Sequence, residues 1–382
     1  MNVLIAIDSF KGSLSSLEAG NAAAMAAREV FPDASVTVSP LADGGEGTMD
    51  AIAACLGGEI CSVDVTGPMG ESVTARYAVV KERKLAVIEM AEAAGLTLVP
   101  KDKRDPKVAT TYGVGELIMH ALNINGCRDF IVCIGGSATN DGGVGMLKAL
   151  GFDFLDQKGN SVPEGAQGLG MIRRIVTENL PHALSKCNFM VACDVKNPLC
   201  GVSGASAVYG PQKGASEADV KIMDECLGHF ADLTAEKLGN DLRHVPGVGA
   251  AGGMGFAFLA YLGGQLRPGI ELVADVTALE EKIKNADIVI TGEGRLDAQS
   301  AMGKAPVGVA RLAKKHGKLC IALSGCVGDG AEACNQEGID AFFPIVQAPC
   351  PLEDAMKQKN AQANMKKTAK QALLLVKALK YS

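Results

Sequence analysis

At both ends of this chain, short apolar runs that stop at glycine or an acidic residue alternate with helical patterns, and this rhythm restricts the fold more than any other feature. Residues 3–7 and 35–40 have the length of buried strands, while residues 14–31 and 48–56 have helical periodicity. Alternating strands and helices are typical of a parallel sheet covered by helices. Ser13 is the expected N-cap of the first helix.

The same rhythm returns near the C-terminus. The expected strands are 288–291, 319–324 and 341–346, and the expected helices are 306–315 and 353–379. We therefore expect residues 1–65 and 275–382 to form one parallel-sheet domain, since the termini of such arrangements tend to lie close together.

The middle of the chain has a different pattern. Residues 60–80 alternate between apolar and polar side chains around Gly67-Pro68, which predicts antiparallel strands. A chain of 382 residues also exceeds what one compact core usually holds. We expect an α/β protein in which a mixed-sheet domain, residues 66–274, is inserted into the parallel-sheet domain, with the active site in the cleft between them. Further expected strands are 86–90, 130–134 and 189–193, and further helices are 113–122, 144–150, 218–238 and 251–262.

Composition excludes several classes of protein. The net charge of -6, the low aromatic content of 4% and the absence of Trp disfavour nucleic acid as a partner. No apolar run is long enough for a membrane span, and Asp8 interrupts the opening run too early for a signal peptide. The 12 cysteines form no CxxC pair, so we expect reduced core thiols in a cytoplasmic protein.

Polar, glycine-rich segments follow four expected strands of the parallel sheet. Because the carboxyl ends of parallel strands share one edge, these segments should meet there. A single aspartate after a strand is often only a turn or cap residue, but four such segments predict a binding cleft. They are Asp8-Ser9-Phe10-Lys11-Gly12, Asp43-Gly44-Gly45-Glu46-Gly47, Gly292-Glu293-Gly294-Arg295-Leu296-Asp297 and Ser324-Gly325.

The inserted domain has its own candidate residues. Residues 135–143, with Gly-Gly at each end, follow a strand and precede a helix, which is the arrangement of an anion site or an ordinary turn. Asp141 in this segment would repel a bare phosphate and suits a cation or a substrate hydroxyl. Asp194 ends a strand and is a candidate magnesium ligand, base or cap. Lys213 lies in a loop suited to phosphate, although a lone lysine is usually just solvated.

Two short patterns fail as nucleotide motifs. Residues 247–252 match GxGxxG, but no strand of useful length precedes them. Gly303-Lys304 resembles the end of a P-loop, but Ala298 stands where that motif requires glycine. The sequence also lacks the motif set of protein kinases and the GxSxG elbow of serine hydrolases, and its five histidines have no evident catalytic partners.

The segments Asp8 to Leu14, Ala42 to Thr48, Gly135 to Gly143, Cys193 to Gly214 and Thr291 to Asp297 with Gly303-Lys304 resemble the class I bacterial glycerate kinases. The resemblance covers essentially the whole chain in order; Ile7 departs from the proline expected there. It implies phosphorylation of D-glycerate by ATP with Mg²⁺, most often giving 2-phosphoglycerate and less often 3-phosphoglycerate. It also implies two unlike α/β domains, one of them flavodoxin-like.

These arguments define a set of candidate site residues whose individual roles stay open. A non-catalytic nucleotide- or phosphosugar-binding regulator is the alternative function, and a nicotinamide-dependent dehydrogenase is a third with no credible fingerprint. A homodimer is also possible for such a chain. The candidate catalytic residues are Lys11, Asp194, Arg295 and Asp297; the candidate magnesium ligands are Asp43, Asp194, Glu293 and Asp297; the candidate substrate- or phosphate-binding residues are Asp8, Ser9, Lys11, Gly44, Gly45, Gly135, Gly136, Ser137, Asn140, Asp141, Lys213, Gly292, Arg295, Lys304 and Ser324.

Overall fold

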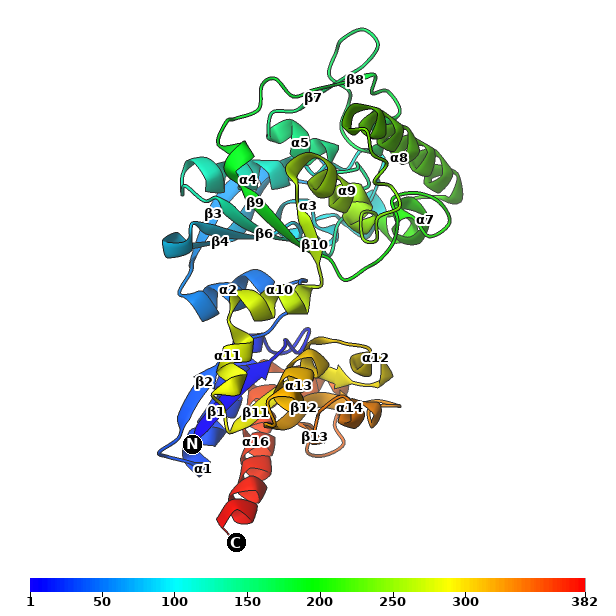
Figure 1. The fold of residues 1–382 in the computed structure, drawn as a ribbon. Helices are drawn as coiled ribbons and strands as arrows, with labels where there is room; N and C mark the ends of the chain where they lie inside the picture. The colour runs from blue at the N-terminus through cyan, green and yellow to red at the C-terminus, as the bar shows by residue number, and fades with distance from the viewer. Residues whose placement is uncertain (382) are drawn as a thin grey trace. The chain divides into compact units, whose positions relative to one another are not determined.

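The computed structural model describes residues 1–381, which divide into two compact units (Figure 1). The units have separate hydrophobic cores. The first unit comprises Met1–Asp43, Asp50–Leu56 and the chain from Ile270 onward. The second comprises Gly44–Met49 and Gly57–Gly269. The predicted α/β class is confirmed, because both chain ends build one parallel sheet and the middle of the chain builds a separate mixed sheet.

The first unit contains a five-stranded sheet in which every pairing is parallel. Its strand order is β13-β12-β11-β1-β2, which becomes 2-1-3-4-5 when the strands are numbered within the unit, the flavodoxin-like order. The order reverses between β1 and β11, so the carboxyl ends of these two strands border the usual ligand site of such sheets. The strands are β1 (Asn2–Ile7), β2 (Ser35–Val38), β11 (Ile288–Leu296), β12 (Leu319–Val327) and β13 (Ala341–Pro344).

Helices cover both faces of this sheet. Successive strand residues point to opposite faces, so Val3, Ile5 and Ile7 pack in a core with α1 and α16, whereas Leu4 and Ala6 pack with α11 and α13. Burial on both faces explains why the strands read as continuous apolar runs. The helices of this unit are α1 (Ser16–Val30), α11 (Leu279–Lys284), α12 (Ala298–Ala301), α13 (Ala305–Lys315), α14 (Ala333–Gln336), α15 (Leu352–Met356) and α16 (Gln358–Tyr381).

The start of α1 differs from the prediction. Ser15, not Ser13, is the N-cap: its Oγ accepts a hydrogen bond from the Glu18 N–H at 3.2 Å, and the Glu18 carboxylate accepts one from the Ser15 N–H at 2.8 Å. The prediction of Ser13 was wrong because residues 10–14 form a tight turn, in which the Phe10 N–H donates to the Leu14 carbonyl at 2.8 Å.

Two expected loops are strand instead. β11 continues to Leu296 and β12 to Val327, and Glu293 and Arg295 lie in parallel register with Ser324 and Cys326. Glycines in these segments had suggested loops, but Gly292 is needed for close strand approach: a Cβ there would lie 2.0 Å from the Leu323 carbonyl oxygen. The expected C-terminal helix is also divided into α15 and α16, because Lys357 has the extended backbone angle ψ 123°.

The second unit contains a six-stranded mixed sheet in the order β10-β9-β6-β5-β4-β3. The β3–β4 and β4–β5 pairs are antiparallel, as the alternating pattern predicts, and the β5–β6, β6–β9 and β9–β10 pairs are parallel. Strand β3 belongs to this sheet, so the boundary lies at Gly57 rather than at residue 66. The strands are β3 (Glu59–Thr66), β4 (Ser72–Val80), β5 (Leu85–Glu89), β6 (Asp129–Cys133), β9 (Asn188–Ala192) and β10 (Gln265–Arg267), with β7 (Asp153–Leu155) and β8 (Arg174–Val176) as a separate pair.

The helices of the second unit surround a core rich in aromatic side chains, in which Phe154, Phe230 and Tyr261 are in mutual ring contact. The unit boundaries at Met49/Asp50 and Gly269/Ile270 fall inside α2 (Thr48–Leu56) and α10 (Gly269–Val276). The other helices are α3 (Ala91–Ala94), α4 (Tyr112–Asn123), α5 (Val144–Ala149), α6 (Ala166–Leu169), α7 (Ala205–Tyr209), α8 (Glu217–Leu238) and α9 (Ala250–Leu262), with short 3-10 helices at Lys81–Arg83, Leu96–Leu98, Lys101–Lys103, Leu184–Lys186 and Pro211–Lys213.

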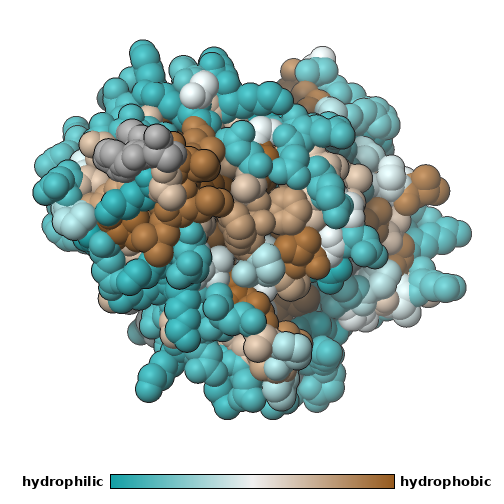
Figure 2. All heavy atoms as spheres, turned by 90° about the horizontal axis from the view of Figure 1, so that it is seen from below, coloured by the Kyte–Doolittle hydropathy of each residue, from teal (hydrophilic) through white to brown (hydrophobic). Residues whose placement is uncertain are grey.

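Some apolar side chains of α16 face outward. Figure 2 shows apolar side chains gathered around the C-terminal end of this helix, where Leu374, Leu375 and Leu379 are exposed.

No helix described between Met1 and Tyr381 has both the length and the apolar character that a membrane span requires. The 12 cysteines, which all fall in the described part of the chain, are free thiols, but Cys326 and Cys350 are exposed and not in the core as predicted.

Candidate active site

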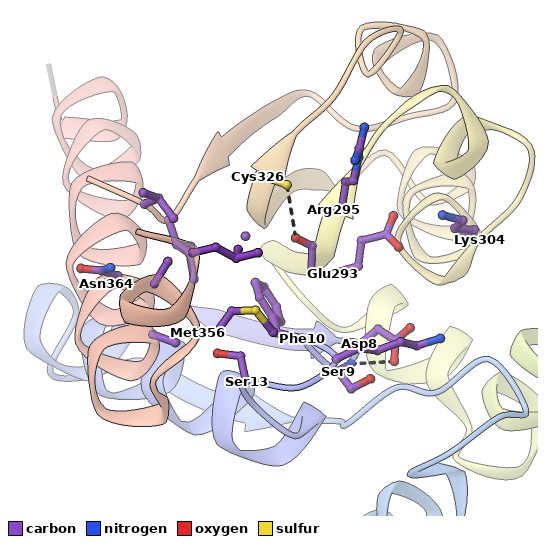
Figure 3. A pocket seen from close by; sticks show the side chains of 18 of the residues that line it. Asp8, Ser9, Phe10, Ser13, Glu293, Arg295, Lys304, Cys326, Met356 and Asn364 are labelled. Atoms are coloured by element: carbon purple, nitrogen blue, oxygen red, sulfur yellow. Dashed lines mark hydrogen bonds between the residues drawn. The ribbon is translucent and has the colours of Figure 1, made fainter. Parts of the chain in front are cut away.

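A cavity of about 420 Å³ opens in the first unit at the point where the strand order reverses. The loop after β1 and the ends of β11 and β12 form one side, and the segment around α15 and the start of α16 forms the other (Figure 3). Of the candidate residues predicted from sequence, the cavity is lined by Asp8, Ser9, Lys11, Asp43, Glu293, Arg295 and Lys304.

The turn after β1 presents Asp8 to this cavity. The Asp8 N–H donates to the Gly292 carbonyl at 2.9 Å, which ties the end of β1 to β11, and the Asp8 carboxylate accepts from the Ser9 N–H at 2.6 Å. Gly12 has a positive φ of 76°, and a Cβ at this position would lie 2.9 Å from the Met356 Cε. The positive φ favours glycine at this turn, whereas the Met356 methyl group ends a flexible side chain that can move aside.

Three carboxyl groups face this cavity and influence one another. The pKa of Asp8 is raised to about 7, first by burial and then by the charges of Asp43 and Glu293, while the Ser9 N–H and Lys11 oppose the rise. Burial likewise raises the pKa of Glu293, whose carboxylate accepts a hydrogen bond from the Ser300 hydroxyl. Perturbed carboxyl groups in a cleft are typical of functional sites.

Asp297 is held differently. Its Oδ1 accepts hydrogen bonds from the N–H groups of Gln299 and Ser300, so it caps α12. Its carboxylate also lies 3.3 Å from the Arg295 guanidinium and 3.9 Å from the Lys304 ammonium. Asp297 is absent from the cavity lining, but it orients two cations that do line it.

Ser324 and Gly292 support the site from within the sheet. Both are buried, neither lines the cavity, and the Ser324 Oγ has no hydrogen-bond partner among the described residues. Their neighbours Glu293 and Gly325 do line it. The segments predicted from sequence therefore border the cavity, whereas individual residues alternate between the cavity and the interior of the sheet.

The second unit gathers a second set of candidates at the carboxyl ends of β6 and β9. The Asp194 Oδ1 accepts a hydrogen bond from the Gly269 N–H at 2.9 Å, and Asp194 is an exposed residue. A Cβ on Gly44, whose φ is 87°, would lie 2.8 Å from the Ala192 Cβ and 3.7 Å from the Asp194 carboxylate. A Cβ on Gly135 would lie 3.6 Å from the Gly45 Cα. The two predicted glycine pairs thus lie side by side because neither carries a side chain.

Lys213 is buried rather than solvated. Its ammonium donates to the Ser137 hydroxyl at 2.7 Å and to the Thr139 carbonyl at 2.6 Å, both in the segment of residues 135–143. Burial lowers the pKa of Lys213 to about 7, against the opposing charge of Asp141. Lys213 therefore holds this segment in shape, and contact with a phosphate would require the segment to rearrange.

Asp141 is also fully enclosed. Its carboxylate accepts hydrogen bonds from the Thr111 N–H and hydroxyl at 2.8 and 2.7 Å and from the N–H groups of Gly143 and Gly145 at 3.0 and 3.2 Å. Burial raises the pKa of Asp141, and these hydrogen bonds partly offset the rise. The carboxylate stabilises the turn before α5, so a direct contact with substrate stays a prediction.

Two polar atoms of the same segment are buried without a partner in the described part of the chain: the Thr139 Oγ1 and the Asn140 Oδ1. The Asn140 amide donates to the Ser206 hydroxyl at 2.9 Å, which fixes its orientation. Buried polar atoms without partners are uncommon in folded proteins, so this segment has unused hydrogen-bonding capacity.

Sequence reasoning missed two features of these sites. Glu89 at the end of β5 is buried, and its carboxylate accepts a hydrogen bond from the Met49 N–H at 2.8 Å, which anchors the segment containing Gly44 and Gly45. The sequence signal that could have identified Glu89 is its position as an acidic residue at the end of the apolar strand of residues 85–89. The apolar wall of the first cavity left no sequence signal, because its residues come from separate elements: Phe10, Ile345, Val346, Leu352, Ala355, Met356 and Ala361.

Comparison with known proteins identifies the family. Residues 3–377 match the model of the glycerate kinase family. The chain belongs to the glycerate kinase family. It is 47% identical over 357 residues to glycerate 2-kinase of Escherichia coli (94% of this chain, 93% of the relative) and 44% identical over 380 residues to glycerate kinase of Bacillus subtilis (100% and 99%). The resemblance noted from the motifs is thereby confirmed, and so is the prediction of a kinase.

A solved structure agrees with this assignment to the glycerate kinase family. A crystal structure of a Salmonella typhimurium LT2 protein, provisionally assigned as glycerate kinase 2, superposes with a TM-score of 0.92 at 46% sequence identity, and each chain is covered completely. The two α/β units are therefore shared with that protein.

Proposed function

We propose that this protein transfers the γ-phosphoryl group of ATP to D-glycerate, forming 2-phosphoglycerate and ADP with the help of Mg²⁺. Membership of the glycerate kinase family carries the proposal. The name of the Escherichia coli relative, glycerate 2-kinase, supports the 2-hydroxyl over the 3-hydroxyl as the acceptor.

The charges of the cavity in the first unit support phosphoryl transfer. Lys11, Arg295 and Lys304 supply three cations beside the acidic groups, and cations of this kind bind phosphate oxygens. Phosphoryl transfer depends mainly on positioning and on neutralising charge, so a protein needs these cations more than a covalent nucleophile.

The carboxylates of the same cavity fit a magnesium ion. Across residues 1–381, no three His, Cys, Asp or Glu side chains are grouped as a complete metal site, but Mg²⁺ is usually held by one or two carboxylates together with substrate phosphates and water. Asp43 and Glu293 would hold it here, because both line the cavity and their charges add to the burial that raises the pKa of Asp8. When bound, Mg²⁺ would neutralise charge on the phosphates.

In the proposed reaction the glycerate hydroxyl oxygen forms a bond to the γ-phosphorus as the bond from that phosphorus to the β,γ-bridging oxygen breaks. The hydroxyl proton passes to a carboxylate, and ADP leaves with the bridging oxygen. Asp194 and Asp297 remain our candidates for the proton acceptor. Lys11 and Arg295 would stabilise the charge on the transferring group.

A coupled assay of ADP formation tests the proposal. With ATP and Mg²⁺, the purified protein should form ADP rapidly only when a short hydroxy acid is present, with D-glycerate the best acceptor, and NMR of the product should show phosphate on the 2-position. Binding of nucleotide without any acceptor-dependent turnover would instead support the alternative, a non-catalytic regulator. A higher kcat/KM for glycerol or a sugar would overturn the substrate assignment.

We also propose a cytoplasmic location, which the free thiols support because thiols persist in reducing compartments. Fractionation of the source cells would test it. The placement of the active site between the two domains and the formation of a homodimer stay predictions from sequence; light scattering during gel filtration would test the second.

A further inference from the structure

The cavity of the first unit has two chemically different ends. Figure 3 shows Asp8, Glu293 and Lys304 on one side and Met356 and Asn364 on the other, with Phe10 between them. The charged end follows the strands of the sheet. Phe10 and Ser13 of the apolar end belong to the motif of residues 8–14, whereas Leu352, Met356 and Asn364 lie outside the family motifs, and the chemistry above uses none of these five side chains.

The apolar end is open to a ligand. Leu352 lines it yet is 73% exposed, and Met356 is half-buried although it contacts the turn at Gly12. When a ligand covers exposed apolar side chains in a concave site, their removal from water makes binding more favourable. The volume of about 420 Å³ also falls within the usual range of roughly 300–1,000 Å³ for small-molecule pockets.

Polar groups accompany this apolar wall. Ser13 lines the cavity, and its Oγ is buried without a hydrogen-bond partner in the described part of the chain. The Asn364 side chain also lines it, and its amide can donate and accept at once. A purine ring presents both donors and acceptors at its edge and apolar faces above and below.

Of the two substrates, only the nucleotide matches both ends. Glycerate has three carbons and is polar throughout, so it would leave the apolar wall uncovered. ATP combines a flat aromatic base with an anionic chain, and a base over Phe10 and Met356 would place that chain toward Lys11 and Lys304.

We propose that the apolar end of this cavity, formed by Phe10, Leu352 and Met356 with Ser13 and Asn364, binds the purine base of the phosphoryl donor. The inference rests on the proposed function in that it takes the donor to be a nucleotide. The segment around α15 is thereby a determinant of nucleotide affinity that lies outside the recognisable family motifs.

The first test measures binding by calorimetry with ADP and with tripolyphosphate, which lacks the base. The double variant Leu352→Ala/Met356→Ala should weaken ADP binding at least about tenfold and leave tripolyphosphate binding unchanged. Leu374→Ala, an exposed leucine of α16 outside the cavity, is the matched control and should change neither. An unchanged ADP affinity in the double variant would overturn the proposal.

A second readout uses two exposed thiols. Cys326 lines the cavity and Cys350 does not, so ADP should slow alkylation of Cys326 and leave Cys350 unaffected, as peptide mass spectrometry would show. The double variant should need at least about ten times more ADP for the same protection. Alkylation of Cys326 at an unchanged rate in saturating ADP would refute binding in this cavity.

These outcomes are separate from those of the activity assay. If ADP protects Cys326 and the double variant weakens that protection while wild-type protein does not turn over glycerate, the base site stands and the proposed function fails. If turnover with D-glycerate is normal and the double variant retains the wild-type KM for ATP, the proposed function stands and the base site fails.

Discussion

At the scale of single residues, Asp8 is the most perturbed carboxyl group of the first cavity. Its pKa of about 7 in the folded protein lies above the ordinary value of 3.8. The native state therefore keeps this proton to a higher pH than the unfolded state, and the free energy of unfolding falls as the pH rises from about 4 to 7. Above pH 7, Asp8 is ionised in the folded protein as well, and the full free-energy cost of its buried charge lowers the stability.

Replacing Asp8 with Asn should remove this cost. Without Mg²⁺, Asp8→Asn should melt above the wild type at pH 8, and the difference should vanish near pH 4. A pKa shift of about three units corresponds to a gain of at most about 4 kcal/mol in the free energy of unfolding. The Asn side-chain oxygen can still accept the hydrogen bond from the Ser9 N–H. Thermal denaturation at the two pH values measures the effect. An equal difference at both pH values would show that ionisation of Asp8 is not the cause.

Asp194 and Asp297 allow catalysis to be distinguished from capping. Asn caps a helix nearly as well as Asp, so Asp297→Asn should keep its hydrogen bonds to Gln299 and Ser300 and its melting temperature. If the charge serves the reaction, turnover should fall about a hundredfold, roughly 3 kcal/mol of barrier. Asp194→Asn should behave in the same way, since its bond to the Gly269 N–H also survives. Near-normal turnover and magnesium dependence in both variants would eliminate these acids as catalysts.

At the scale of elements, the start of α1 determines how the turn after β1 is connected to the helix that covers the sheet. The capping box of Ser15 and Glu18 satisfies N–H groups that the first helical turn leaves unpaired. Ser13, two residues earlier, has a buried hydroxyl with no partner in the described chain. The two serines therefore form a matched pair for a stability measurement.

Ser15→Ala should destabilise the protein by about 1 kcal/mol, a typical loss for an N-cap. Ser13→Ala should not destabilise it, because it removes an unpaired buried hydroxyl. Urea denaturation of the two variants gives both values. A larger loss at Ser13 than at Ser15 would contradict the assignment of the cap.

At the scale of the whole molecule, the two units have separate cores. Two cores on the faces of the parallel sheet belong to the first unit, and one larger core belongs to the second. A ligand that binds only a folded unit stabilises that unit by mass action. The nucleotide should therefore stabilise the unit that binds it more than the other unit.

Calorimetry should resolve two transitions, and ADP with Mg²⁺ should raise one of them. At a free ligand concentration of about 100 times Kd, the gain should be about 2.7 kcal/mol. Hydrogen exchange should locate the protection in residues 8–14, 293–297 and 345–364 of the first unit. Protection confined to residues 57–269 would place the nucleotide in the other unit.

The sequence by itself determined the architecture of this protein, because its signals are local. Apolar runs of strand length, helical periodicity and the alternating pattern of residues 60–80 predict two kinds of sheet, and the structure contains both. The motifs also predicted segments that line the cavity of the first unit, since side chains at the carboxyl ends of parallel strands share one edge.

Only the tertiary structure decided which side chains reach the cavity and which are used internally. Asp141 and Lys213 look like ligand-binding residues in the sequence, yet burial and internal hydrogen bonds occupy them. Phe10 and Met356 look like ordinary core residues, yet they line the cavity. Burial and proximity depend on segments far apart in the chain, and no local pattern encodes how residue 10 and residue 356 come to face the same space.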